Sequence, residues 1–301
     1  MDWLVGGCLP YADSMNHVVT HIGFGEAGRA FAQAGARAFD RKVREAAFRE
    51  EMLAAYTAAR VEGVESAAAA LEGAVAVLSL VTADQALAAA RDYAPHLEPD
   101  ALWFDMNSVA PDTKRSAAEA VHAAGARYVD VAVMAPVHPA RFDVPLLVSG
   151  PHADAGLAQL AAVGFMHVRK IDGGIGAASA VKMIRSVMVK GIEALTAECV
   201  IAAEAAGVRL EVLASLDASE RAGSWTERAD YNLDRMLVHG LRRAAEMEEV
   251  VKTLDGLGTG SGMSRGTVER QRVLGGLGVG APDGLDAKLD VLLSRKQERA
   301  A

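Results

Sequence analysis

The chain of 301 residues lacks the features that mark secreted, membrane or nucleic-acid-binding proteins. Its two cysteines, Cys8 and Cys199, are too few and too far apart for a disulfide framework, so we expect a cytoplasmic protein in a reducing compartment. No apolar run reaches the roughly 18 residues of a transmembrane helix, and no Lys or Arg precedes the apolar stretch of residues 1–16 as in a signal peptide. The net charge of −8 and the lack of a polybasic tract argue against nucleic acid and acidic membranes as partners. Because no Cys and His cluster has metal-ligand spacing, we expect no metal site either.

A glycine-rich turn follows the first β-rich run of the chain. The run is Val18–Ile22, and Gly23, Gly25 and Gly28 follow it, before an alanine-rich stretch that we expect to be helical to about Gly35. In such a turn the first glycine permits a tight bend, the second lets backbone N–H groups approach a pyrophosphate, and the third lets the helix pack against its strand. The phosphates lie at a helix N-terminus, which favours negative charge. The pattern predicts a dinucleotide site formed by Gly23, Phe24, Gly25, Glu26, Ala27 and Gly28.

The choice of dinucleotide depends on the end of the second β-rich run, Arg37–Phe39. Asp40 ends this run at roughly the 20-residue spacing from the first glycine at which a carboxylate meets the adenosine ribose. A carboxylate accepts hydrogen bonds from the ribose hydroxyls and repels a 2′-phosphate, so we expect NAD rather than NADP. Arg41, Lys42 and Arg44 leave NADP open, because they could hold a 2′-phosphate if the carboxylate turned aside. They could also form a solvated basic face.

The order of patterns along the chain predicts two folded domains. Up to residue 171, short β-rich runs alternate with alanine-rich helical stretches, as in βαβ units around a parallel sheet. The later runs are 74–81, 101–106, 126–133, 145–148 and 166–169. From residue 177 onward the pattern is helical and begins with a long stretch to 206. We therefore expect an α/β fold with a Rossmann-like dinucleotide-binding domain (15–171), joined by a long interdomain helix to an all-α substrate and dimerisation domain (172–301). Residues 1–14 are interpreted as an unstructured extension, with Met15 as the true start.

Lys182 and Ser186 are the side chains of the long helical stretch that could carry chemistry. They are four residues apart and therefore share one face of a helix. Apolar residues flank the lysine, and a lysine partly removed from water is suited to exchange a proton with an alcohol or carbonyl oxygen while hydride moves to a nicotinamide. The alternative is a lysine that extends its charged end from a partly buried helix into solvent.

Together these motifs resemble the β-hydroxyacid dehydrogenase superfamily, whose members include 3-hydroxyisobutyrate and 6-phosphogluconate dehydrogenases. Residues 22–28 resemble the family's cofactor turn, 80–82 hold the place of its nicotinamide loop, and 104–108 are similar to its Asp-x-Ser-Thr strand end. Residues 176–182 resemble the start of the helix that carries the catalytic lysine, with Ala178 in place of a glycine. The resemblance implies Lys182, Ser186 and Ser108 as catalytic residues. Cofactor contacts besides the turn are then Asp40, Arg41, Val81, Thr82 and Asn107.

The substrate loop departs from the family's pattern. The family's Asp-Ala-Pro-Val-Ser-Gly-Gly corresponds to residues 130–136, where Met134 replaces the serine and removes a hydroxyl that holds a substrate carboxylate. The family's asparagine four residues beyond the lysine is Ser186. These changes argue against the usual small hydroxyacids and indicate a less characterised branch of the superfamily. Other parts of that similarity are 133–137, 145–150 and 239–249.

A basic segment of the helical domain could replace the lost anion contact. Arg242 and Arg243 precede Glu246 by four and three residues, which is typical of a salt-bridged helix face. Alternatively one arginine, with His239, reaches the substrate and binds its carboxylate. The candidate substrate contacts are Met134, Ala135, His239, Arg242 and Arg243. We expect the remaining histidines, including His21, to have structural or solvent roles.

The function predicted from the sequence is hydride transfer between NAD, or else NADP, and a small-molecule substrate of the 3-hydroxy carboxylate type. Lysine-assisted proton transfer would accompany the hydride. The alternatives are an imine or ketone reductase of the same architecture and a nucleotide-binding protein without catalysis. Because the α-domains of the superfamily commonly pair, we expect a homodimer.

Overall fold

The computed structural model describes residues 18–219 and 223–298, with side chains described up to 294. The described residues form two compact units, the first unit up to Val187 and the second unit from Met188. The expected extension 1–14 and the start at Met15 lie outside the described residues. The domain boundary after residue 171 stays a prediction.

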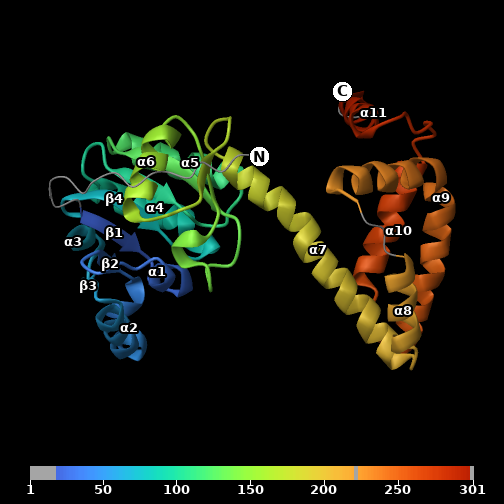
Figure 1. Cartoon of the computed structure of the whole chain (residues 1–301), viewed down its shortest axis with the longest axis horizontal. Helices are drawn as coiled ribbons and strands as arrows, with labels where there is room; N and C mark the ends of the chain where they lie inside the picture. Colours follow the sequence, from blue (N-terminus) through green and yellow to red (C-terminus); the bar gives the residue numbers. More distant parts are fainter. Residues whose placement is uncertain (1–17, 220–222, 299–301) are drawn as a thin grey trace. The chain divides into compact units, whose positions relative to one another are not determined.

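The first unit is built on one sheet (Figure 1). Eight strands of the described chain are ordered β3-β2-β1-β4-β5-β6-β7-β8 in it. The strands are β1 (Val18–Ile22), β2 (Arg37–Phe39), β3 (Glu62–Gly63), β4 (Ala74–Ser79), β5 (Leu102–Asp105), β6 (Arg127–Val133), β7 (Leu146–Ser149) and β8 (Val168–Lys170). β1 pairs in parallel with both β2 and β4, so the strand order reverses there, as in doubly wound sheets. The Rossmann-like class is therefore confirmed.

Three local expectations need correction. The sheet is not wholly parallel, because β6 and β7 pair antiparallel. Their connection, 134–145, contains only a short 3₁₀ turn, η4 (Arg141–Asp143), and is too short for a helical crossover. The exposed two-residue strand β3 has no apolar alternation and was not expected. The helix after the glycine turn, α1 (Glu26–Ala30), ends well before Gly35, because buried Phe31 packs against Phe165 at 4.9 Å between ring centroids.

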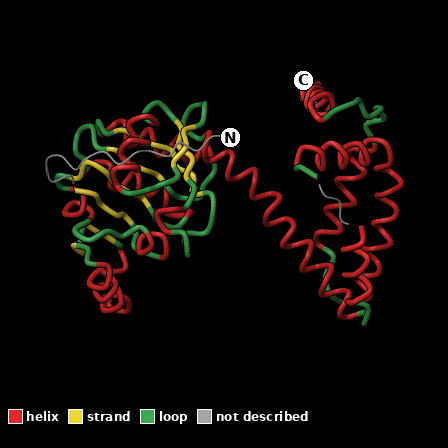
Figure 2. Tube along the Cα trace, viewed as in Figure 1, coloured by secondary structure: helices red, strands yellow, loops and turns green. Residues whose placement is uncertain are grey.

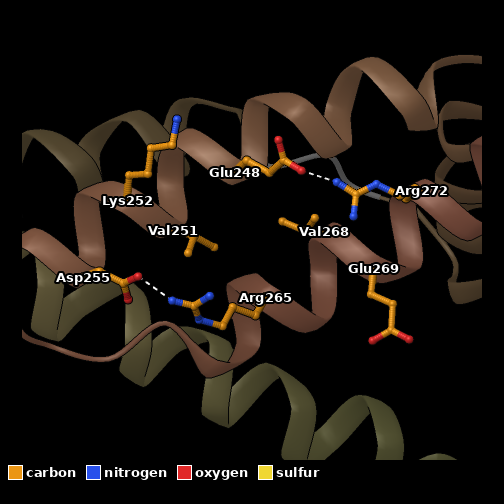
Figure 3. A pocket seen from close by; sticks show the side chains of 8 residues that line it. All are labelled: Glu248, Val251, Lys252, Asp255, Arg265, Val268, Glu269 and Arg272. Carbon is orange, nitrogen blue, oxygen red and sulfur yellow. Dashed lines mark hydrogen bonds and ion pairs between the residues drawn. The ribbon is translucent and has the colours of Figure 1, made fainter.

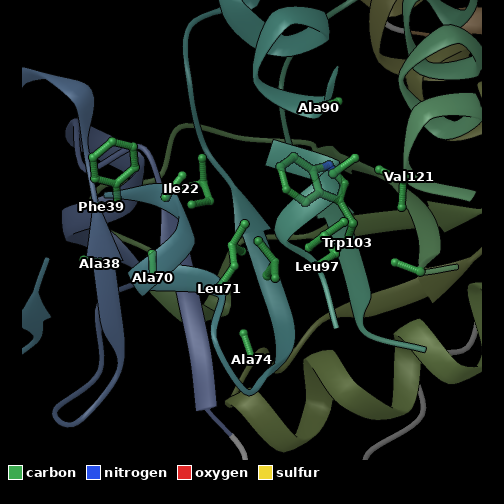
Figure 4. Packing of buried hydrophobic residues seen from close by; sticks show 14 of the residues in the cluster. Ile22, Ala38, Phe39, Ala70, Leu71, Ala74, Ala90, Leu97, Trp103 and Val121 are labelled. Carbon is green, nitrogen blue, oxygen red and sulfur yellow. The ribbon is translucent and has the colours of Figure 1, made fainter. Parts of the chain in front are cut away.

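Helices cover both faces of the sheet. They are α2 (Ala46–Ala59), α3 (Ala67–Leu71), α4 (Ala86–Tyr93), α5 (Pro111–Ala123) and α6 (Ala153–Val163), with 3₁₀ turns η1 (Arg41–Arg44), η2 (Ala83–Gln85) and η3 (Ala94–His96). Successive strand residues point to opposite faces. In β5, Trp103 joins the apolar cluster under α2–α5 (Figure 4), whereas Phe104 joins the cluster under α6. Both side chains are fully buried, so the carboxyl end of this strand is held from both sides.

The second unit consists of helices and connecting loops (Figure 2). They are the later part of α7 (Ala177–Ala205), then α8 (Arg209–Ser219), α9 (Trp225–Leu257), α10 (Gly262–Gly275) and α11 (Leu285–Glu298). α9 and α10 cross closely, because a Cβ placed on Gly240 would lie 2.7 Å from the Cα of Gly275. Glu198 of α7 accepts hydrogen bonds from two backbone N–H groups at the start of α10. The all-α second part is confirmed, and none of the described helices combines the length and apolar character needed to cross a membrane.

The buried His21 makes the first unit sensitive to acid. Burial lowers the pKa of His21 from 6.5 to about 4, and neither ring nitrogen has a hydrogen-bond partner among the described residues. Between these two pH values the unfolded chain takes up a proton that the folded chain does not, so the free energy of unfolding falls as the pH falls through this window, by at most about 3 kcal/mol.

We expect His21→Leu to flatten the loss of stability between pH 6.5 and about 4. The measurement is thermal or urea unfolding across this range, with His96→Leu, which replaces an exposed histidine, as the matched control. An unchanged pH profile in His21→Leu would show that the His21 ring is not what couples folding to acid.

Candidate active site

The three glycines of the turn differ in how much space the structure leaves for a side chain. Gly23 has φ +91°, and a Cβ there would lie 2.6 Å from the carbonyl oxygen of Leu80. A Cβ on Gly28 would lie 2.5 Å from the carbonyl oxygen of Gly23. A Cβ on Gly25 meets nothing within 4 Å. Packing therefore requires the first and third glycines, whereas the second leaves open space beside the start of α1, where the turn was predicted to receive a pyrophosphate.

Asp40 is held in a fixed orientation against the turn. Its Oδ2 accepts a hydrogen bond from the backbone N–H of Phe24 at 2.8 Å, and its Oδ1 accepts one from the N–H of Lys42 at 3.0 Å. The Asp40 N–H donates to the hydroxyl of Tyr56, whose pKa burial raises to about 12. Because a carboxylate has about four lone-pair sites, two acceptor positions are left for a ligand.

The basic residues after Asp40 are engaged with their own surroundings. Arg41 donates to the side-chain oxygen of Gln85 at 2.8 Å, and Arg44 donates to the carbonyl oxygen of Glu65 at 2.7 Å. The Lys42 ammonium lies 5.3 Å from the centroid of the Phe48 ring. Arg41, Lys42 and Arg44 could hold a 2′-phosphate only if the carboxylate of Asp40 turned aside. In this arrangement it does not.

A pocket of about 380 Å³ opens at the carboxyl ends of β4, β5 and β6, next to the glycine turn. It lies within the first unit and is lined by Glu26, Ala27, Leu80, Val81, Ala83, Met106, Asn107, Ser108, Val133, Ala135, Pro136, Val137 and Lys182. Open α/β sheets bind ligands outside the carboxyl ends of their strands. The structure thus brings together seven of the predicted site residues, from five segments of the chain: Glu26, Ala27, Val81, Asn107, Ser108, Ala135 and Lys182.

Other predicted residues lie beside this pocket without lining it. Thr82 is the N-cap of η2. Met134 packs against a small apolar cluster that includes Leu147 and Ala178, so its side chain fills the space between β7 and α7. The hydroxyl of Ser186 donates to the carbonyl oxygen of Lys182 at 2.9 Å. The pocket wall from this part of the chain is made instead by residues 135–137.

A buried polar network supports the segment 106–108. The carboxylate of Asp105 accepts hydrogen bonds from the backbone N–H of Asn107 at 3.0 Å and from its side-chain Nδ2 at 2.8 Å. It also accepts one from the Tyr128 hydroxyl at 2.7 Å, whose pKa burial and the nearby Asp105 charge raise well above its usual value. The Asn107 Nδ2 donates to Ser79 as well, and its Oδ1 has no hydrogen-bond partner among the described residues. The network therefore fixes Asn107 with one buried acceptor unused.

The same network fixes the start of α7. Oδ2 of Asp130 accepts hydrogen bonds from the N–H groups of Gly176 at 3.0 Å and Ser179 at 3.1 Å. Lys114, on α5, has its ammonium 3.0 Å from Asp105 and 3.4 Å from Asp130, and all three side chains are at most 1% exposed. Asp130 therefore holds the backbone of α7 about one helical turn before Lys182.

The sequence analysis missed this network, although the sequence contains a signal for it. Asp105 ends β5, Asp130 is its register partner in the middle of β6, and Lys114 lies on the stripe of α5 that Ala117, Ala118 and Val121 bury. A lysine on the apolar face of a helix needs a buried partner. Two aspartates within neighbouring apolar strands are the obvious partners.

The basic candidates of the second unit lie on α9. Arg242 approaches the carboxylate of Glu246 to 3.5 Å, which is the salt-bridged helix face considered from the sequence. His239 and Arg243 are half-buried on the same helix. Their contact with a substrate stays a prediction.

The second unit has a hollow of its own, of about 490 Å³, between α9 and α10 (Figure 3). Valines form its floor and charged side chains its rim, and the rim charges pair across it, Glu248 with Arg272 and Asp255 with Arg265. None of the predicted site residues lines it. Because four of its rim charges already pair with one another, it offers a ligand less than the pocket of the first unit.

Comparisons with known proteins match both parts of the chain. Residues 18–161 match the profile of the NAD binding domain of 6-phosphogluconate dehydrogenase, and residues 203–274 match a domain of unknown function, DUF1932. A conserved hypothetical protein from Sinorhizobium meliloti 1021 is 36% identical over 94% of this chain and 97% of its own, with a TM-score of 0.58. The comparison with curated proteins gave no match.

Two further solved structures share this fold. A conserved protein of unknown function, reported as structurally similar to 3-hydroxyacid dehydrogenases, is 27% identical over 85% of this chain and 96% of its own, with a TM-score of 0.54. An imine reductase from Myxococcus stipitatus, in complex with NADP+, is 18% identical over 88% of this chain and 96% of its own, with a TM-score of 0.68. At that identity the likeness shows the fold alone.

Substitution of the second glycine tests the turn as a pyrophosphate site. We expect Gly25→Ala to leave the melting temperature almost unchanged, because its Cβ meets nothing within 4 Å, yet to weaken NADH binding, because the methyl group occupies the space of the phosphates. Calorimetric titration with NADH measures the binding. Gly28→Ala is the contrasting control and should lower the melting temperature. Gly25→Ala with wild-type affinity would contradict the assignment.

Proposed function

Because the chain belongs to the β-hydroxyacid dehydrogenase superfamily, in one family with the Sinorhizobium meliloti protein, we propose that it transfers hydride between a nicotinamide dinucleotide and a 3-hydroxy carboxylate. The observation that carries this proposal is the convergence of Lys182, Asn107 and Ser108 on one pocket beside the glycine turn. A half-buried lysine near a hydroxyl and an amide can exchange a proton with the alcohol or carbonyl oxygen of a substrate.

The residues present fit a nicotinamide dinucleotide. Gly25 leaves room for the pyrophosphate, Asp40 keeps acceptor positions toward the turn, and the buried Oδ1 of Asn107 lacks a donor among the described residues. When bound, the dinucleotide accepts or supplies the hydride. The fixed orientation of Asp40 supports NAD over NADP, because its negative charge repels a 2′-phosphate at the adenosine ribose.

We propose distinct roles for the polar groups of the pocket. Lys182 gives a proton to the substrate oxygen during reduction and takes it back during oxidation. The Ser108 hydroxyl hydrogen-bonds that oxygen and holds it toward the lysine, while Asn107 orients the ligand through Oδ1. Ser186 donates its proton to the carbonyl oxygen of Lys182, so it can serve a substrate only as an acceptor. In this scheme a substrate carboxylate finds its counter-charge at Lys182.

Imine or ketone reduction is the second candidate, favoured by the apolar wall of the pocket. Val133, Ala135, Pro136 and Val137 line the side where the family's substrate loop has a serine and two glycines. Proline has no N–H to offer a carboxylate. This wall suits a substrate with an apolar substituent, which fits a cyclic imine or a ketone as well as an alkyl-substituted hydroxyacid.

Lys182→Met tests the proposed proton transfer. We expect turnover of a panel of 3-hydroxyacids with NAD+ to fall by about 10² to 10⁴, the range of general acid–base catalysis, while NADH binding is kept. Absorbance of the reduced nicotinamide follows turnover. Lys190→Met, an exposed lysine two turns further along α7, is the matched control and should keep full activity.

The same assay separates the competing functions. Full turnover in Lys182→Met contradicts the assigned role of the lysine. Faster turnover of cyclic imines or ketones with NADH, compared with hydroxyacids with NAD+, replaces the hydroxyacid proposal with the second candidate. Tight NADH binding with no turnover across the whole panel supports a non-catalytic nucleotide-binding protein.

We also propose that the protein works as a homodimer through its helices. In the single chain α7 and α8 expose large apolar side chains, among them Ile184 and Leu210, each 71% exposed. Others on these two helices are Val187, Met188, Ile192, Leu195, Ile201 and Leu216. Large apolar side chains exposed in this number indicate an interface, and pairing of two copies would cover them.

Light scattering after size exclusion measures this directly. We expect twice the chain mass of 31.5 kDa at micromolar concentration, and a shift toward the monomer in the variant Leu210→Glu. Replacing an exposed residue of the first unit, as in Phe48→Glu, should leave the mass unchanged. A wild-type protein that elutes as a monomer would contradict the proposal.

A further inference from the structure

Lys114 is a buried cation that the proposed chemistry does not use. Its side chain is 0% exposed, and its ammonium donates to a carboxylate oxygen of Asp105 at 3.0 Å and to the carbonyl oxygen of Val131 at 3.3 Å. It also donates to the carbonyl oxygen of Asp105 and pairs with Asp130 at 3.4 Å. It does not line the pocket. Three buried charges at this spacing therefore lie directly behind the pocket residues.

Each of the two carboxylates holds a different part of the pocket. Asp105 binds the backbone N–H and side chain of Asn107, which precedes Ser108. Asp130 binds the N–H groups of Gly176 and Ser179 at the start of α7, which carries Lys182. Lys114 is the cation that joins these two carboxylates within the described network. The ammonium group of Lys114 thus links the two catalytic segments through their carboxylates.

A second set of hydrogen bonds connects the start of α7 to the segment that contains Asn107 and Ser108. The hydroxyl of Ser179 donates to the carbonyl oxygen of Val109, so the first turn of α7 is tied directly to the segment that follows Ser108. The Ser149 hydroxyl donates to Asp130 and accepts from the N–H of Ala178. The start of α7 is therefore held at once from β6, from β7 and from the segment between β5 and α5, while Lys182 lies one turn beyond these anchors.

Loss of the Lys114 ammonium would disturb the arrangement of Asp105 and Asp130. Two carboxylates that share a buried site without a cation cannot both stay ionised, so one takes up a proton or they move apart. Either change weakens their bonds to Asn107 or to the N–H groups of α7. A displacement of about 1 Å at a reacting group can cost about 100-fold in rate.

We propose that Lys114 is a positioning residue that sets the distance between Lys182 and the segment Asn107–Ser108. It acts through Asp105 and Asp130 and touches neither cofactor nor substrate. The consequence for catalysis rests on the proposed function, in which Lys182 moves the proton. The consequence for the placement of Lys182 does not depend on that function and can be measured without a substrate.

The test compares Lys114→Met with Lys170→Met in the full-length protein. Lys170 is an exposed lysine of the first unit that pairs with Asp154 at the surface, so it controls for the loss of one charge. Acetic anhydride at limiting dose labels the amines, and mass spectrometry gives the labelling rate of Lys182 in each protein. We expect this rate to change by about 10-fold in Lys114→Met, as local order at the start of α7 is lost, and to stay at the wild-type value in Lys170→Met.

Ser179→Ala is the second variant, for the case in which Lys114→Met does not fold. It removes one hydroxyl from the same anchor without leaving a buried charge unpaired, and the Lys182 labelling rate should change in the same direction. With an active substrate, Lys114→Met should lower kcat by about 100-fold and change KM less, while NADH affinity stays close to that of the wild type.

The outcomes separate the two proposals. A lower melting temperature with unchanged Lys182 labelling in both Lys114→Met and Ser179→Ala overturns the positioning role, because a merely structural lysine affects stability alone. Altered labelling in a protein for which no substrate is turned over supports the positioning role and counts against the proposed function. Altered labelling together with a selective loss of kcat supports both.

Discussion

The ion network of Lys114, Asp105 and Asp130 is the interaction on which the rest of the site depends. Removing three charges from water is costly, and their mutual attraction offsets that cost only where the geometry is good and the remaining hydrogen-bonding positions are filled. Here backbone N–H groups, a tyrosine hydroxyl and a serine hydroxyl fill most of them. Oδ1 of Asp130 has no hydrogen bond among the described residues and relies on its ion pair with Lys114 at 3.4 Å. Such a network contributes less to stability than to the selection of one arrangement. It fixes how the end of β5, the middle of β6 and the start of α7 lie.

The chemistry of the pocket follows from that arrangement. Asn107 has both amide hydrogens used by Asp105 and Ser79, so it presents an acceptor to a ligand and no donor. Lys182 provides the cation, whereas the wall formed by residues 135–137 provides apolar surface in place of the polar loop of the superfamily. The site thus combines features that resemble those of the β-hydroxyacid dehydrogenase superfamily with a substrate side of different character. For this reason hydroxyacids, ketones and imines are all candidate substrates.

The sequence predicted much of the fold and of the pocket, because both depend on local signals. Glycines at fixed spacing after a strand, polar residues at strand ends and a lysine near a helix start can each be recognised in the chain, and parallel strands bring them to one edge. The antiparallel direction of β7 was not predicted, because it follows from the length of a connection and no residue pattern indicates it. Met134 was assigned to the substrate by alignment with a serine; its side chain packs against the cluster that includes Leu147 and Ala178, and its contact with a substrate stays a prediction. Lys114 was missed because its partners lie on two strands that only the fold brings beside α5.

The most direct measurement of the central claim is a crystal structure of the protein with NADH bound. The account predicts the pyrophosphate beside Gly25, the nicotinamide in the pocket between Val81 and Lys182, and the amide group of the nicotinamide donating a hydrogen bond to Oδ1 of Asn107. Lys114 should keep its bonds to both aspartates. A dinucleotide bound away from the glycine turn, or with its nicotinamide outside the pocket and Asn107 still without a donor, would contradict the account.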